Sequence, residues 1–138
     1  MIRLNLRKFG GRGSDSGMTS SGSAPIRNNA TAYDGISNLP SKIGSNQRWV
    51  LQREYAVEGG GTHRAFEGKG TYEANDHDIV ARNEGFKSTS ALKRAYKSRT
   101  ESVKVGDQAW TGKRDSSGKM IWGKVTKNKY RPVLVTLG

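Results

Sequence analysis

The residues of this chain that are suited to chemistry are cations and aromatic rings, and they gather in its C-terminal part. Residues 85–138 contain thirteen basic and three acidic residues, a net charge of +10, together with two of the three tryptophans. Arg binds phosphate oxygens as a planar fork and Lys as a point charge, while aromatic rings stack on nucleobases. The C-terminal part is therefore predicted to bind a polyanion, above all nucleic acid.

Two groups of residues are expected to contact this ligand. The first lies on a predicted helix and the residues beside it: Lys87, Lys93, Arg94, Lys97, Arg99 and Lys104. The second lies on predicted strands: Lys113, Arg114, Lys119, Trp122, Lys124, Lys127, Lys129 and Arg131. An ordinary solvated face is the alternative for the helix. For Trp110 and Trp122 the composition favours core positions, because large aliphatic residues are few, and base stacking is the alternative.

No catalytic, metal-binding or cofactor-binding set is legible. The chain has no cysteine, which excludes thiol catalysis, disulfides and cysteine-ligated zinc. Asp76, His77 and Asp78 offer oxygen and nitrogen ligands, but the ligand ladder of a calcium loop is missing and two histidines are too few for a typical zinc site. We therefore predict a polar turn at this motif and a non-catalytic protein without metal or cofactor.

The elements that must position the basic residues are predicted to be several strands and one helix. Alternation places Trp49, Leu51, Tyr55 and Val57 on one face of a strand over residues 49–57. Ser88 is the predicted N-cap of a helix through about Thr100, with an inner face of Leu92, Ala95, Tyr96 and Val103. Further strands are expected over residues 64–72 with a bulge at 68–70, and over residues 79–81, 103–111, 119–126 and 130–137, with turns at 115–118 and 127–129.

These elements predict an α+β fold, a small curled antiparallel sheet or an SH3-like barrel with one basic helix. The folded domain is expected over residues 46–138. Residues 1–45 are rich in Gly, Ser and Asn and are predicted to form a flexible basic arm. Arm residues expected to follow a phosphate backbone are Arg3, Arg7, Lys8 and Arg12. Ile36, Leu39 and Ile43 are expected to dock the end of the arm onto the domain.

Two resemblances extend this prediction. The turn Val105-Gly106-Asp107 before Trp110, followed by Trp122-Gly123-Lys124-Val125 and Val133-Leu134-Val135, is similar to the strand-and-turn rhythm of SH3-like barrels over residues 103–137. The string Phe9-Gly10-Gly11-Arg12-Gly13 resembles an N-terminal signature of small phage and mobile-element proteins of Gram-positive bacteria. This second resemblance implies a phage or mobile-element origin and the cytoplasm of a bacterial host cell.

The leading functional hypothesis is a basic protein that binds nucleic acid or a ribonucleoprotein. One alternative is a counter-defence inhibitor of the anti-CRISPR type, which docks on a host nuclease or its guide RNA. Another is a structural component of a virion. The chain shows no secretory signal and no apolar stretch long enough for a membrane span, so a membrane is not expected as a partner. A small-molecule substrate is not expected either, because no catalytic set is legible.

Overall fold

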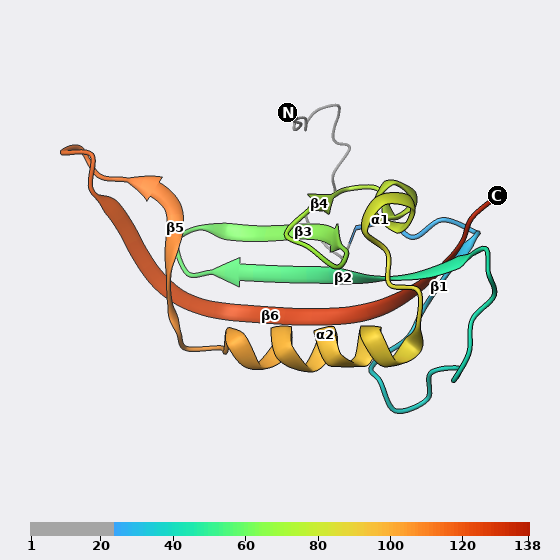
Figure 1. Cartoon of the computed structure of the whole chain (residues 1–138). Helices are drawn as coiled ribbons and strands as arrows, with labels where there is room; N and C mark the ends of the chain where they lie inside the picture. Colours follow the sequence, from blue (N-terminus) through green and yellow to red (C-terminus); the bar gives the residue numbers. More distant parts are fainter. Residues whose placement is uncertain (1–23) are drawn as a thin grey trace.

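The computed structural model, which describes residues 24–138, contains one open antiparallel sheet with two helices packed on it (Figure 1). The strands are β1 (Ala30–Ala32), β2 (Gln47–Val57), β3 (Gly61–Glu67), β4 (Glu73–Ala74), β5 (Gln108–Arg114) and β6 (Met120–Thr136). The helices are α1 (His77–Glu84) and α2 (Thr89–Ser102). The strand order is β1-β6-β2-β3-β4, and β5 pairs with the first part of β6. No helix within residues 24–138 is both long and apolar enough to cross a membrane.

One face of the sheet is covered by α1. Asp76 caps this helix, since its Oδ1 accepts a hydrogen bond from the backbone N–H of Asp78 at 2.8 Å. The residues of the apolar cluster under α1 are Ala24, Val50, Phe66, Val80, Ala81, Val133 and Val135. Burial of a Val or Phe side chain stabilises a fold by about 1.5–3 kcal/mol. This cluster therefore fixes α1 and the segment that begins at Ala24 on the sheet.

The opposite face is covered by α2. Ser88 is its N-cap, as predicted, and the Ser88 hydroxyl accepts from the backbone N–H of Ala91 at 3.1 Å. The predicted inner face is confirmed for Leu92, which is buried, and for Ala95 and Tyr96, which pack around it. The buried residues of this second cluster are Trp49, Leu51, Phe86, Leu92 and Tyr130. The central strand β2 is thus buried on both faces, with Trp49 facing α2 and its neighbour Val50 facing α1.

The longest strand, β6, has two parts with different partners. Val125 and residues 127–136 pair with β2, whereas residues 120–124 pair with β5. Ala56 opposes Lys127 and Val57 opposes Val125, which leaves Thr126 as the extra residue of a β-bulge. A bulge bends its strand and increases the local twist. Beyond the bulge, β6 turns past the ends of β2 and β3, and the β5–β6 hairpin projects from the sheet (Figure 1).

The predicted α+β class and the antiparallel sheet are confirmed, but the SH3-like barrel is wrong. The sheet does not close, because β1 and β4 are edge strands that do not pair with each other. A single helix was expected, and the described residues form two. Residues 79–81, predicted as a strand, lie within α1, where the Asp76 cap starts a helix whose apolar side faces the sheet.

Three strands were predicted after residue 102, and the structure has two. The predicted turn at residues 127–129 is wrong, because Lys127, Asn128 and Lys129 continue β6 and pair with Ala56, Tyr55 and Glu54 of β2. The strand predicted over residues 103–111 begins only at Gln108, since residues 104–107 form a turn closed by a hydrogen bond from the Asp107 N–H to the Lys104 carbonyl.

Two further boundaries differ from the prediction. β3 ends at Glu67, so residues 68–70 are a connection to β4 and not a bulge within one strand. The predicted arm ends too late in the sequence, because β1 at Ala30–Ala32 pairs with Val133–Val135 of β6 and Ala24 is buried in the core. Leu39 and Ile43 pack on the α2 side of the sheet, as expected. Residues 1–23, with Arg3, Arg7, Lys8 and Arg12, lie outside the described residues.

We expect Gly123→Ala to destabilise the fold by about 1–3 kcal/mol, the range of overpacking substitutions. A Cβ at this position would lie 2.2 Å from the carbonyl oxygen of Glu58, where the β5–β6 hairpin packs against the turn after β2. Gly35→Ala is the control, because nothing lies within 4 Å of a Cβ there. Urea unfolding of both variants measures the difference. Equal stability of the two variants would contradict the close packing of this hairpin.

Candidate nucleic-acid interface

The tip of the β5–β6 hairpin is held by Asp115. Its Oδ1 accepts hydrogen bonds from the hydroxyl of Ser117 at 2.7 Å and from the backbone N–H of Lys119 at 3.0 Å. The hydrogen bond from Ser117, followed by that from Lys119, lowers the pKa of the Asp115 carboxyl. Gly118 adopts a φ of 89°, a conformation that favours glycine, so the predicted turn at residues 115–118 is confirmed. This turn joins β5 to β6, the two paired strands that carry the basic residues of the hairpin.

Two tryptophans lie side by side on one face of this hairpin. Trp110 of β5 and Trp122 of β6 are direct cross-strand partners, so their side chains project from the same face. Trp110 is 41% exposed and Trp122 is 58% exposed. The prediction that favoured core positions for both tryptophans is therefore wrong. The core is filled by Trp49 and by other aromatic and aliphatic residues of the sheet and helices, whereas the tryptophans of the hairpin are exposed.

Cations flank the tryptophan pair on the same face. Lys124 pairs with Gln108 on one side of it, and Arg114 pairs with Met120 on the other. The Arg114 guanidinium lies 5.3 Å from the centre of the Trp110 ring and donates to the carbonyl of Gly118 at 3.0 Å. The face thus consists of three cross-strand pairs, with the aromatic pair between two that carry a cation. We call this surface of Gln108, Trp110, Arg114, Met120, Trp122 and Lys124 the hairpin face.

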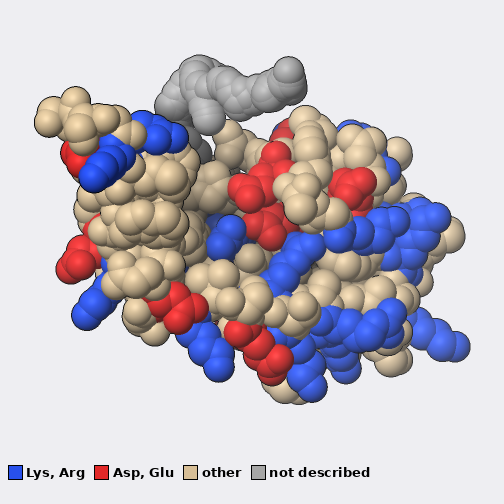
Figure 2. Space-filling view, turned by 60° about the vertical axis from the view of Figure 1, so that its left-hand side comes forward, with Lys and Arg blue, Asp and Glu red and all other residues tan. Residues whose placement is uncertain are grey.

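Further basic residues continue along β6 beyond the bulge. Lys127, Lys129 and Arg131 oppose Ala56, Glu54 and Gln52, and so lie on the face of the sheet that α1 covers in part. Lys129 is exposed and has no ion-pair partner within residues 24–138, whereas Lys127 pairs with Glu54 at 3.2 Å. Figure 2 shows Lys and Arg side chains gathered in a broad band across the right and lower parts of the molecular surface.

The basic residues of α2 form a separate surface. Lys93, Arg94 and Lys97 are exposed on the helix, which packs on the sheet face opposite to α1. The helix and the strands were expected to contact the same ligand, but Lys127, Lys129 and Arg131 lie on the face of the sheet opposite to α2. Lys87 precedes α2 and Lys104 follows it, and both are exposed. Lys113 and Lys119 are exposed on the hairpin itself.

Two of the predicted contact residues, Arg99 and Arg131, are half-buried and bonded to other parts of the domain. The Arg99 guanidinium bonds Glu67 at 3.0 Å and the carbonyl of Gly68 at 2.5 Å, and 19% of its side chain is exposed. Glu67 is buried, and this desolvation raises its pKa, which the nearby Glu73 raises further. Arg131 donates from Nε to the Gln52 side-chain oxygen at 2.9 Å. Arg99 and Arg131 thus tie elements of the fold together.

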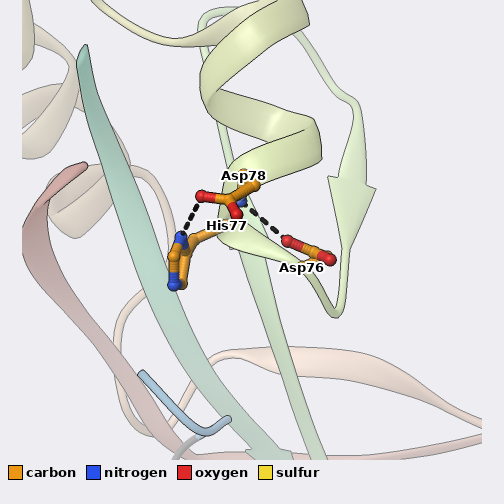
Figure 3. A group of neighbouring side chains, drawn as sticks. All are labelled: Asp76, His77 and Asp78. Carbon is orange, nitrogen blue, oxygen red and sulfur yellow. Dashed lines mark hydrogen bonds and ion pairs between the residues drawn. The ribbon is translucent and has the colours of Figure 1, made fainter. Parts of the chain in front are cut away.

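The Asp76-His77-Asp78 group is the start of α1 and not an exposed polar turn (Figure 3). His77 is buried, and its Nε2 accepts the backbone N–H of Arg27 at 3.2 Å. The other ring nitrogen, Nδ1, lies 3.1 Å from Asp78 Oδ1. The Arg27 guanidinium binds the carboxylates of both Asp76 and Asp78. One possible metal-ligand atom from each of the three side chains lies within 4.8 Å of the others. These side chains bond to Arg27 and Asn29, and so hold residues 24–29 against α1.

Sequence reasoning missed Gln108 and Met120 of the hairpin face, and it favoured a core position for Trp110. The alternation Met120, Trp122, Lys124 is the signal that would have found Met120, since these residues share one face of a strand. Gln108 and Trp110 join the face through the pairing of β5 with β6. Ile121 and Val105 are further exposed apolar residues of this region.

Comparison of the chain with protein-family models, curated protein sequences and solved structures finds no match.

We expect Trp122→Ala to change the free energy of unfolding by about 0.5 kcal/mol or less, as is usual for surface positions. Trp49→Ala should cost about 3–5 kcal/mol, because Trp49 is fully buried and donates from its indole to Thr89. Chemical denaturation of the two variants gives both values. A loss of several kcal/mol in Trp122→Ala would place its ring in the core and remove it from the contact surface.

Proposed function

We propose that this protein is a non-catalytic module that binds nucleic acid, free or within a nucleoprotein, through the hairpin face and the adjoining cations of β6. The observation that carries the proposal is the exposed Trp110–Trp122 pair, placed between Arg114 and Lys124. Adjacent aromatic rings that are exposed to solvent are typical of a contact surface. Cations on both sides of the rings favour a ligand that has planar groups and negative charge. The net charge of +12 for the whole chain supports a polyanionic ligand.

The cations of this surface are available to phosphates. The ammonium groups of Lys113, Lys119, Lys124 and Lys129 make no ion pair or hydrogen bond with residues 24–138, and all four residues are exposed. Internal pairing would have to be broken before an ammonium group could neutralise a phosphate. Four unpaired ammonium groups on the hairpin and along β6 therefore support a surface that neutralises several phosphates at once.

A second candidate function is docking on a protein partner, such as a host nuclease in a counter-defence role. The observation that favours it is the number of exposed apolar side chains on and beside the hairpin: Val105, Met120 and Ile121. Apolar and aromatic residues are enriched in the buried centre of protein interfaces. The N-terminal resemblance to phage and mobile-element proteins is compatible with both candidates.

The two candidates differ in their response to salt. For nucleic acid, about four to six neutralised phosphates give a slope of log affinity against log salt near −3 to −5. The triple variant Lys119, Lys124 and Lys129→Gln should make this slope shallower by about 2–3, because each lost phosphate contact removes about one released counterion. Fluorescence anisotropy with labelled single-stranded and duplex oligonucleotides measures the slope.

The matched control is the triple variant Lys93, Arg94 and Lys97→Gln on α2. It removes the same number of positive charges, again from exposed side chains that make no ion pair with residues 24–138. These three residues lie on α2, which packs on the face of the sheet opposite to that of Lys129. We expect it to change the slope less than the hairpin variant does. Equal effects of the two triple variants would mean that net charge alone governs binding. No binding of either oligonucleotide at low salt would refute the proposal and leave a protein partner.

A further inference from the structure

The two tryptophans of the hairpin face are held in different ways. The Trp110 indole N–H donates to the carbonyl of Lys113 at 2.9 Å, and the Arg114 guanidinium lies near its ring. The Trp122 indole makes no hydrogen bond with residues 24–138, and it is the more exposed of the two. Trp110 is therefore a fixed platform, whereas the Trp122 ring is free to cover a ligand placed on the hairpin.

The surroundings of the pair suit a flat apolar group joined to an anionic backbone. Met120 lies two residues before Trp122, on the same face of β6, and extends the apolar surface of its ring. Lys124 lies on the other side of Trp122, and Arg114 stands opposite Met120, so a cation is present at each end of the aromatic pair. A ring seated on the tryptophans would have its attached phosphates near these cations. A nucleotide has this combination of parts.

The pairing state of the bases decides whether they can reach the rings. In a duplex both faces of an internal base are covered by its neighbours, so stacking on a side chain first requires unstacking or extrusion of the base. A base in a single strand is open to an aromatic ring without that cost. Stacking on an aromatic side chain changes affinity by about 5- to 150-fold per base and tolerates any base, because every base has a π-face.

We propose that the hairpin face binds the unpaired bases of single-stranded nucleic acid, with Trp122 as the stacking ring and Trp110 as its fixed neighbour. This inference rests on the proposed function and names its ligand class. The ligand chemistry is an unpaired base on a phosphodiester chain. Stacking on an aromatic ring tolerates any base, so binding through the tryptophans is expected to depend little on sequence.

The test compares three labelled probes of about 16 nucleotides, the upper end of the site size of one single-strand-binding fold. They are an oligothymidine, an oligomer of the same length with abasic sites in place of its bases, and a dA·dT duplex. We expect the oligothymidine to bind at least 5-fold more tightly than the abasic oligomer, and more tightly than the duplex. An oligouridine of the same length shows whether RNA or DNA is the better source of unpaired bases.

Variants of Trp122 separate stacking from charge. We expect Trp122→Ala to lower the affinity for oligothymidine to that for the abasic oligomer, and to leave the affinity for the abasic oligomer unchanged. Trp122→Phe keeps a ring at this position and should retain part of the difference. Equal affinity of the wild-type protein for oligothymidine and the abasic oligomer, or tighter binding of the duplex, would overturn this inference and leave the proposed function standing. Failure to bind any of the probes at low salt would overturn both.

Discussion

The ladder between β2 and β6 is the interaction on which the rest of the structure depends. Each residue from Gln47 to Ala56 pairs with a residue between Lys127 and Thr136, and both faces of this pair are covered. A slip of one residue would exchange the side chains under α1 with those under α2, so the register is strongly specified. β1 and β3 pair with the outer edges of this ladder, and each helix packs on one of its faces.

The hairpin face follows from what happens where this ladder ends. The extra residue Thr126 bends β6 away from β2, and the close approach of Gly123 to the Glu58 carbonyl holds the hairpin across the turn after β2. The ribbon beyond this point has two strands and one packed side. Its other side carries Trp110 and Trp122 and has no element of residues 24–138 over it. The two indole rings of the hairpin are therefore exposed to solvent, while the core of the domain is buried.

The sequence predicted those parts of the fold that depend on neighbours along the chain. The alternation through Trp49 and Leu51, the Ser88 cap and the turn at Asp115 are local patterns, and the structure confirms them. The continuity of β6 was not predictable in this way. The polar run at residues 127–129 has the composition of a turn, and its pairing with β2 depends on residues about 70 positions earlier, such as Glu54, which bonds Lys127.

The candidate site was predicted in part for the same reason. The segment that carries it, with its cations and Trp122, could be found from composition. Whether a tryptophan is buried or exposed depends on whether another element packs over its face of the sheet, and composition does not reveal this. Arg99 is a similar case, because its partner Glu67 is distant in sequence and only the fold brings the two together. Isolated cations at exposed positions, such as Lys124, were easier to predict than cations that bond within the domain.

The most direct measurement of the central claim is a titration of the ¹⁵N-labelled protein with an unlabelled single-stranded oligonucleotide, followed through the indole N–H signals of its three tryptophans. Trp49 is sealed between the sheet and α2 and serves as an internal reference. We expect the indole signals of Trp110 and Trp122 to shift with the titration while that of Trp49 stays in place. Shifts confined to backbone signals of α2, with both hairpin indoles unmoved, would contradict the claim that the hairpin face is the contact surface.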